Sequence, residues 1–197
     1  MDAGALPRLD YTRRLADEVV RDLPPGEILR AVDFEASRET AMSGRLADYR
    51  TIVFATHGVL DAEHPALSGI VLSMVDERGQ PRDGLLLLPD VYQLELNADL
   101  VVLGACQTAL GKEVQGEGLI GLSRGFLSAG ARRVLGSLWK VDEEATVALL
   151  MELHRSARKN GGNQARALRE AQLRVRRDPR WRSPYYWAGF TLQGEWN

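Results

Sequence analysis

Leu100-Val-Val-Leu-Gly-Ala-Cys106 is the stretch of this sequence that decides the fold. Its four consecutive apolar residues show no polar alternation and include β-branched valines, which is typical of a strand buried on both faces. Thr51-Ile-Val-Phe-Ala55 is a second run of this kind, and Arg133 to Trp139 is a third. Because a strand with two buried faces needs covering elements on both sides, these runs predict a parallel sheet between layers of helices.

Helical patterns occur between the three strand runs and on both sides of them. The expected helices cover 11–23, 34–47, a short segment after Pro89, 119–129, 142–160 and 163–178, and the further strands cover 69–75, 84–88 and 185–192. Asp142 is predicted to cap the N-terminus of the 142–160 helix, with Glu143 and Glu144 placed favourably in its first turn. The alternation of strands and helices predicts an α/β fold with a mostly parallel sheet and helices on both faces.

Length and composition predict a single packed domain. The chain has 197 residues, of which 45% are hydrophobic and 26% charged, as in ordinary globular proteins. The formal net charge of −2 gives no bulk attraction to nucleic acid or to an acidic membrane. Cys106 is the only cysteine, so no internal disulfide can form, and neither a leader peptide nor a run of about 20 apolar residues is found. We therefore expect a cytoplasmic protein with no membrane partner.

Two residues capable of nucleophilic catalysis follow two of the strand runs. His57 comes soon after 51–55, and Cys106 comes soon after 100–103. In open α/β sheets functional residues collect at the carboxyl ends of the strands, so these two side chains are expected to meet. A neighbouring imidazole raises the thiolate fraction of a cysteine and can protonate a leaving amine. Their separation of about 50 residues matches that between the histidine and the cysteine of caspases.

Gly58 completes the predicted catalytic site. Without a side chain, it lets backbone N–H groups approach the carbonyl under attack. Its amide and that of Cys106 are therefore candidates for an oxyanion hole. No close pairing of histidines or cysteine indicates a zinc site, and His154 falls on the apolar face of its helix. The expected chemistry needs neither a metal ion nor an organic cofactor.

Five motifs stand out along the chain. They are Phe54-Ala-Thr-His57-Gly58, Ala98 to Gly111, Gly116 to Phe126, Ser137-Leu-Trp-Lys-Val-Asp142 and Pro184 to Phe190. In combination, over 51–196, they resemble the CHAT domain family, the caspase-like cysteine peptidases often found with tetratricopeptide repeats. The resemblance implies a caspase-like sheet and puts His57 and Cys106 at the catalytic dyad positions. It also implies that residues 1–197 form one CHAT domain at the C-terminal part of a longer protein, regulated by such repeats or another module.

The resemblance further suggests how a protein substrate is chosen. Separases, a related caspase-like family, carry a similar Leu-Trp-x-Val segment followed by an acidic residue that binds arginine. This points to Asp142 first, and then to Glu143, as substrate-binding residues, and it predicts cleavage after arginine or lysine. Asp142 is equally well explained as a helix cap, and its two carboxylate oxygens can serve the two roles separately.

Two other functions also fit the sequence. The first is a catalytically silent interaction module of the same fold. The second is a dinucleotide-binding domain, because Gly116-x-Gly118-x-x-Gly121 fits the dinucleotide fingerprint and Asp142 follows about 20 residues later. Against this second function, the fingerprint should follow its strand directly, whereas Gly116 comes well after 100–103. Glu117 would also put a carboxylate beside a pyrophosphate.

Residues 155–182 form a basic run, in which ten lysines or arginines are opposed only by Glu170 and Asp178. Such a run is usually solvated helix surface, but it also suits an acidic regulatory partner. Direct binding of nucleic acid is not expected, because no aromatic residue interleaves the basic ones before Trp181.

Overall fold

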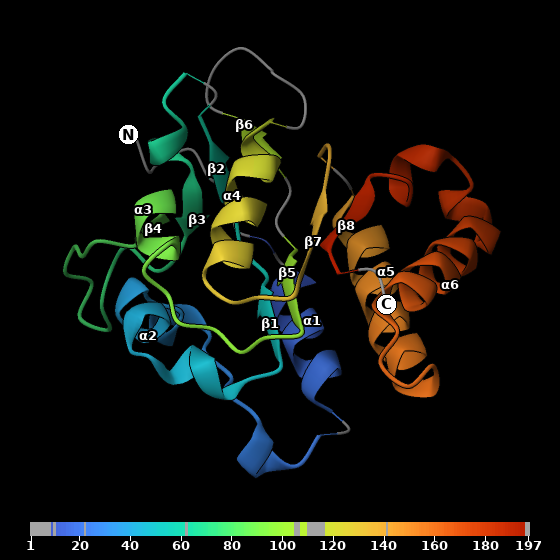
Figure 1. Cartoon of the computed structure of the whole chain (residues 1–197), viewed down its shortest axis with the longest axis horizontal. Coiled ribbons are helices and arrows are strands. Elements are labelled where there is room, and N and C mark those ends of the chain that lie inside the picture. The colour runs from blue at the N-terminus through green and yellow to red at the C-terminus, as the bar shows by residue number, and fades with distance from the viewer. Residues whose placement is uncertain are drawn as a thin grey trace.

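The computed structural model describes residues 9, 11–21, 23–61, 63–104, 107–109, 117–140 and 142–195. Its centre is a four-stranded sheet in the order β1-β5-β7-β8 (Figure 1). The strands are β1 (Thr51–Phe54), β5 (Leu100–Leu103), β7 (Arg133–Ser137) and β8 (Phe190–Gly194). The first three are the predicted buried runs and lie parallel, whereas β8 is antiparallel to β7. Because Phe54 pairs with Leu103 and Val102 with Leu135, the carboxyl ends of β1, β5 and β7 share one edge.

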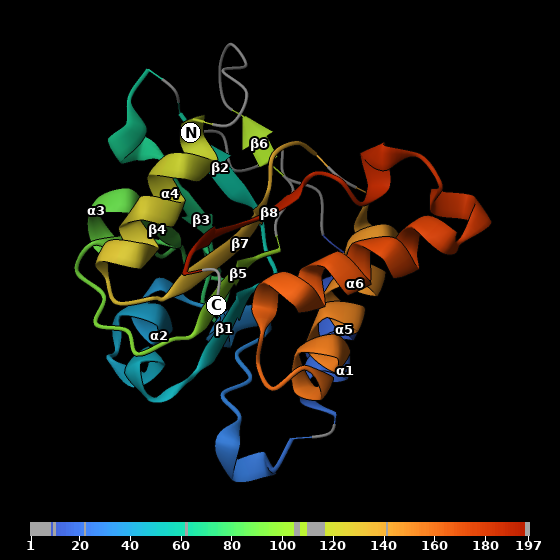
Figure 2. The same ribbon diagram turned by 45° about the vertical axis from the view of Figure 1, so that its right-hand side comes forward.

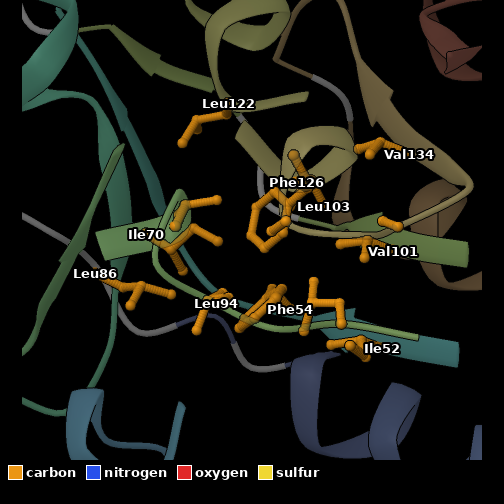
Figure 3. Close-up of a cluster of buried hydrophobic side chains, with 14 of the residues drawn as sticks. Ile52, Phe54, Ile70, Leu86, Leu94, Val101, Leu103, Leu122, Phe126 and Val134 are labelled. Atoms are coloured by element: carbon orange, nitrogen blue, oxygen red, sulfur yellow. The ribbon is translucent and has the colours of Figure 1, made fainter. Parts of the chain in front are cut away.

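Side chains of the parallel strands point alternately to the two faces of the sheet, and both faces are buried. Val101 and Val134 belong to one hydrophobic cluster, which also contains the fully buried Phe126 (Figure 3). Val102 and Leu135 belong to a second cluster on the opposite face. Burial on both faces explains why these strands carry no polar alternation.

Helices cover the two faces as separate layers (Figures 1 and 2). One layer contains α1 (Tyr11–Val20), α5 (Glu143–Lys159) and α6 (Gln164–Arg177), and the other contains α2 (Arg38–Met42), α3 (Leu88–Val91) and α4 (Glu117–Ser128). Asp142 caps α5 by accepting the N–H of Ala145 at 2.9 Å, and Asn163 caps α6 by accepting the N–H of Arg166 at 2.8 Å. The predicted α/β fold, with helices on both faces, is confirmed.

A second, smaller sheet continues from the carboxyl edge of the first, in the order β4-β3-β2-β6. Its strands are β2 (Gly58–Leu60), β3 (Gly69–Val71), β4 (Leu85–Leu87) and β6 (Gln107–Ala109). β2 and β6 pair in parallel, and β3 is antiparallel to both β2 and β4. β3 and β4 are shorter than the strands expected at 69–75 and 84–88, and β2 and β6 were not predicted. Three residues give too short a pattern to recognise.

Three further expectations about local structure were wrong. Residues 34–47 do not form one helix, because Gly44, in a left-handed conformation with φ of 80°, separates α2 from a short helical turn. β7 ends at Ser137 rather than at Trp139, and β8 begins at Phe190 rather than at Tyr185. The remaining helical turns are η2 (Pro25–Glu27), η3 (Asp33–Glu35), η4 (Arg45–Asp48), η5 (Pro65–Leu67), η6 (Pro179–Trp181) and η7 (Pro184–Tyr186).

Candidate functional site

His57 lies at the shared carboxyl edge, between the end of β1 and the start of β2. Its backbone is fixed from the side of β3, because its carbonyl accepts the N–H of Val71 at 2.8 Å. The hydroxyl of the preceding Thr56 donates to the carbonyl of the same residue, Val71, at 2.6 Å. The half-buried imidazole is therefore carried on a segment held between two sheets.

Cys106 lies outside the described residues, as does Ala105, but the chain is described on both sides of them. Before the gap, the N–H of Gly104 donates to the carbonyl of Phe54 at 2.9 Å. After the gap, Gln107 pairs with Gly58. The residues that bracket the cysteine thus pair with the residues that bracket His57.

Gly58 is the first residue of β2 and is in register with Gln107 of β6. Among the atoms of the described residues, the nearest to a Cβ atom added at Gly58 is the carbonyl oxygen of Gly69 at 3.8 Å, which is an ordinary contact. Contacts with the described residues therefore do not require a glycine here.

The loop after β7 is anchored to the segment before β8. The indole Nε1 of Trp139 donates to the carbonyl of Tyr185 at 2.9 Å, and the N–H of Leu138 donates to the carbonyl of Gly189 at 2.8 Å. The hydroxyl of Ser137 donates to the carbonyl of Trp139 at 3.0 Å, which tightens the turn. The sequence predicted strands over 133–139 and 185–192 but gave no sign of this contact, because the two segments lie far apart in the chain.

Asp142 follows this anchored loop and caps α5 with one carboxylate oxygen. Oδ1 accepts the N–H of Ala145, and the Asp142 carbonyl accepts both the N–H and the hydroxyl of Thr146, at 3.0 and 2.7 Å. Within the described ranges, Oδ2 has no hydrogen bond. Glu143 is the first residue of α5 and is half-buried. The predicted capping role is confirmed.

The glycines of the dinucleotide fingerprint do not sit where that function needs them. Gly118 and Gly121 lie inside α4, which follows β6 rather than β5. A Cβ on Gly121 would touch Leu88 of α3 at 4.0 Å, and one on Gly125 would come within 2.8 Å of the same side chain. Gly125, which is not part of the fingerprint, therefore serves close packing between α3 and α4, whereas the contact at Gly121 is an ordinary one. Gly116 lies outside the described residues.

In the ranges that the structure describes, no three His, Cys, Asp or Glu side chains are grouped so that they could hold a metal ion. The same ranges contain no helix with the length and apolar character needed to cross a bilayer.

A family model, the CHAT domain, matches residues 1–195 of this chain. The chain belongs to the CHAT domain family. The match begins before residue 51, where the motifs that carried the resemblance start, and takes in the N-terminal helices. The CHAT domain belongs to the caspase-like peptidase clan and implies its fold, in agreement with the sheet described above.

Two curated relatives of this CHAT domain are large repeat proteins. Tetratricopeptide repeat protein 28 of Mus musculus is 39% identical over 113 residues, and that of Homo sapiens is 41% identical over 110 residues. These regions cover 57% and 56% of this chain, but only 4% of each relative. The similarity therefore concerns one small part of those proteins.

Proposed function

We propose that this CHAT domain is a cysteine endopeptidase that uses His57 and Cys106 as its catalytic dyad. The observation that carries the proposal is the pairing on both sides of the two residues. Gly104 is bonded to Phe54, and Gln107 is in register with Gly58. Because the carboxyl ends of neighbouring parallel strands meet at one edge of the sheet, these pairings support a contact between the imidazole and the thiol.

The chemistry is acyl transfer to sulfur followed by hydrolysis. The Cys106 thiolate attacks the peptide carbonyl carbon, and the N–H groups of Gly58 and Cys106 stabilise the resulting oxyanion. The C–N bond then breaks as the protonated His57 gives its proton to the leaving amine. Water attacks the thioester, His57 takes up its proton, and the thiolate leaves as the acid product is released. No metal ion or organic cofactor takes part in these steps.

Asp142 is proposed to read the side chain before the scissile bond, with Glu143 beside it. β7 lies next to β5, so the anchored loop that follows β7 starts from the same edge as the segment bearing the thiol. The Oδ2 atom of Asp142 is left free by the helix cap and can pair with a guanidinium or ammonium group. We therefore propose a protein substrate that is cleaved after arginine or lysine.

Regulation by a second module accompanies this proposal. The relatives are named for tetratricopeptide repeats and are far longer than the matched region. We propose that this domain forms the C-terminal part of such a longer cytoplasmic protein and has low activity when isolated. Sites completed by loop ordering are often switched on by a partner in this way.

The dyad is tested by screening the folded chain against a denatured peptide library. Cys106→Ala should abolish cleavage, and His57→Ala should reduce it by about two to four orders of magnitude. His64→Ala is the matched control, because His64 has a side chain 70% exposed and lies away from this edge on the turn before β3. Cleavage by Cys106→Ala would end the assignment of the nucleophile. A folded wild-type chain that cleaves no peptide, even when the repeat module is present, would identify it as a silent interaction module.

Thiol labelling tests the dyad without turnover. An imidazole that raises the thiolate fraction of Cys106 should make this thiol react faster with iodoacetamide in the wild type than in His57→Ala. The His64→Ala variant should react at the wild-type rate. Equal rates in all three proteins would contradict the proposed contact between the two residues.

A further inference from the structure

A groove of about 480 Å³ lies between α1, α5, α6 and the turn that follows α6. α5 contributes apolar lining through Val147, Ala148 and Met151, while Val175 and Trp181 contribute it from the other side. Val147, Val175 and Trp181 are buried, so they form a fixed floor rather than mobile surface side chains. The groove therefore has an apolar floor and lies in the helical layer that covers one face of the central sheet.

Every carboxylate along the rim already has an arginine partner. Arg155 pairs with Glu152 at 2.6 Å on α5. Arg180 pairs with Asp178 at 2.9 Å and with Glu144 at 3.1 Å, and its guanidinium lies 4.2 Å from the ring centre of Trp181. These contacts close the end of the groove between α6 and the first turn of α5. They leave no acidic side chain to balance the other rim arginines.

Three arginines make up the unbalanced positive charge of the rim. Arg14 comes from α1, and Arg174 and Arg177 come from α6. All three are exposed, and in the described part of the chain none of them lies within ion-pair distance of a carboxylate. The apolar floor thus runs between unpaired cations that belong to two different helices.

The groove has the length of a short helix. Its lining residues on α5 run from Glu144 to Arg155, which corresponds to about 16 Å along the helix axis. An apolar floor with charged rims is the arrangement by which grooves receive amphipathic helices.

We propose that this groove docks an amphipathic helix of a partner protein, with an apolar face on the floor and acidic side chains toward Arg14, Arg174 and Arg177. Charge complementarity selects an acidic helix, since the rim offers unpaired cations and no unpaired carboxylate. The groove reaches Glu144, within the first turn of α5 that Asp142 caps. Docking concerns binding only and does not depend on peptidase activity.

A display library of helical peptides, selected on the folded chain, tests this surface. Helices with apolar residues at i, i+4 and i+7 flanked by Asp or Glu should be enriched. The enriched peptides, synthesised and titrated, should bind the Arg174→Glu, Arg177→Glu double variant at least about tenfold more weakly than the wild type. Their dissociation constants should also rise with salt concentration.

Arg169→Glu is the matched control, because Arg169 is an exposed α6 arginine that does not line the groove. It should bind the peptides as the wild type does. Loss of binding equal to that of the double variant would overturn the proposal, as would failure to enrich acidic helices. Two other results would also overturn the proposal. In the first, a nucleoside triphosphate raises the Tm of the wild type but not that of the double variant. In the second, the wild-type chain forms a dimer and the double variant does not.

Discussion

The indole ring of Trp139 lies directly on the backbone of Gly189, so that a Cβ atom at Gly189 would come within 2.8 Å of the ring. The same indole donates its N–H to the carbonyl of Tyr185 at 2.9 Å. Trp139 thus joins the loop after β7 to the segment that leads into β8. The start of α5, with Asp142 as its cap, follows this joined loop, and its position therefore depends on a contact with the C-terminal segment.

Gly189→Ala tests the importance of this contact for stability. The added methyl group would meet a ring that is itself held by a hydrogen bond, so neither partner can move freely. We expect the free energy of unfolding, measured with urea, to fall by about 1–3 kcal/mol. Gly26→Ala is the control, because a Cβ at Gly26 has nothing within 4 Å. If the two variants had the same free energy of unfolding, the Trp139 ring would have shifted without loss of stability.

The central sheet was predictable from sequence because burial on both faces leaves a local signature. β1, β5 and β7 are apolar runs without alternation, and Asp142 and Asn163 are strong caps, so these elements were found within a few residues. Short strands that are held mainly by their partners could not be predicted from the sequence. β2 and β6 are three residues each and pair with one another, and β2 also pairs with β3 on its other side.

The candidate site was likewise predictable from the sequence only in part. His57 and Gly58 could be chosen from sequence because their residue types and strand-end positions are local signals. The bond between Gly104 and Phe54, and the anchoring of Trp139 by Tyr185, could not, since each joins residues far apart in the chain through backbone carbonyls. Any residue type supplies such a carbonyl, so the sequence carries no mark of it.

Gly58→Ala separates packing from catalysis at the proposed oxyanion hole. Among the described residues, the nearest atom to a new Cβ is the carbonyl oxygen of Gly69 at 3.8 Å, an ordinary contact, so stability should change by less than about 0.5 kcal/mol. The methyl group would crowd the substrate carbonyl as it approaches the Gly58 amide. We expect kcat on a cleaved peptide to fall at least about tenfold. An unchanged kcat would argue against this amide as a donor.

Arg38 and Asp90 predict how stability depends on acid. The Arg38 guanidinium donates to both oxygens of Asp90, at 3.1 and 2.7 Å, and joins α2 to α3. These bonds, with a further one from the N–H of Leu87, hold the pKa of Asp90 below its ordinary value of 3.8. A lowered pKa means that the stabilisation is present above about pH 4 and is lost as the pH falls through the folded-state pKa.

Arg38→Met removes this contribution. At neutral pH it should lower the free energy of unfolding by about 2 kcal/mol, and the difference from the wild type should shrink as the pH is taken below about 4. Urea unfolding of the wild type and the variant at several pH values measures the loss of stability at neutral pH and its dependence on pH. Arg78→Met is the control, because Arg78 is exposed and has no ion pair among the described residues. A difference that stayed constant down to about pH 2 would show that Asp90 is not the carboxylate concerned.

Asp142 is proposed to have two roles, and two substitutions separate them. Asp142→Asn keeps an oxygen for the N–H of Ala145 and preserves the cap, whereas Asp142→Ala loses it and should lower stability by about 1 kcal/mol. Both variants remove the charge that would pair with arginine. On matched peptides with Arg or Met before the scissile bond, we expect both to reduce the Arg-to-Met ratio of kcat/KM at least about tenfold. If the residue is only a cap, Asp142→Ala alone changes stability and the ratio stays at the wild-type value in both, which would end the proposed role in specificity.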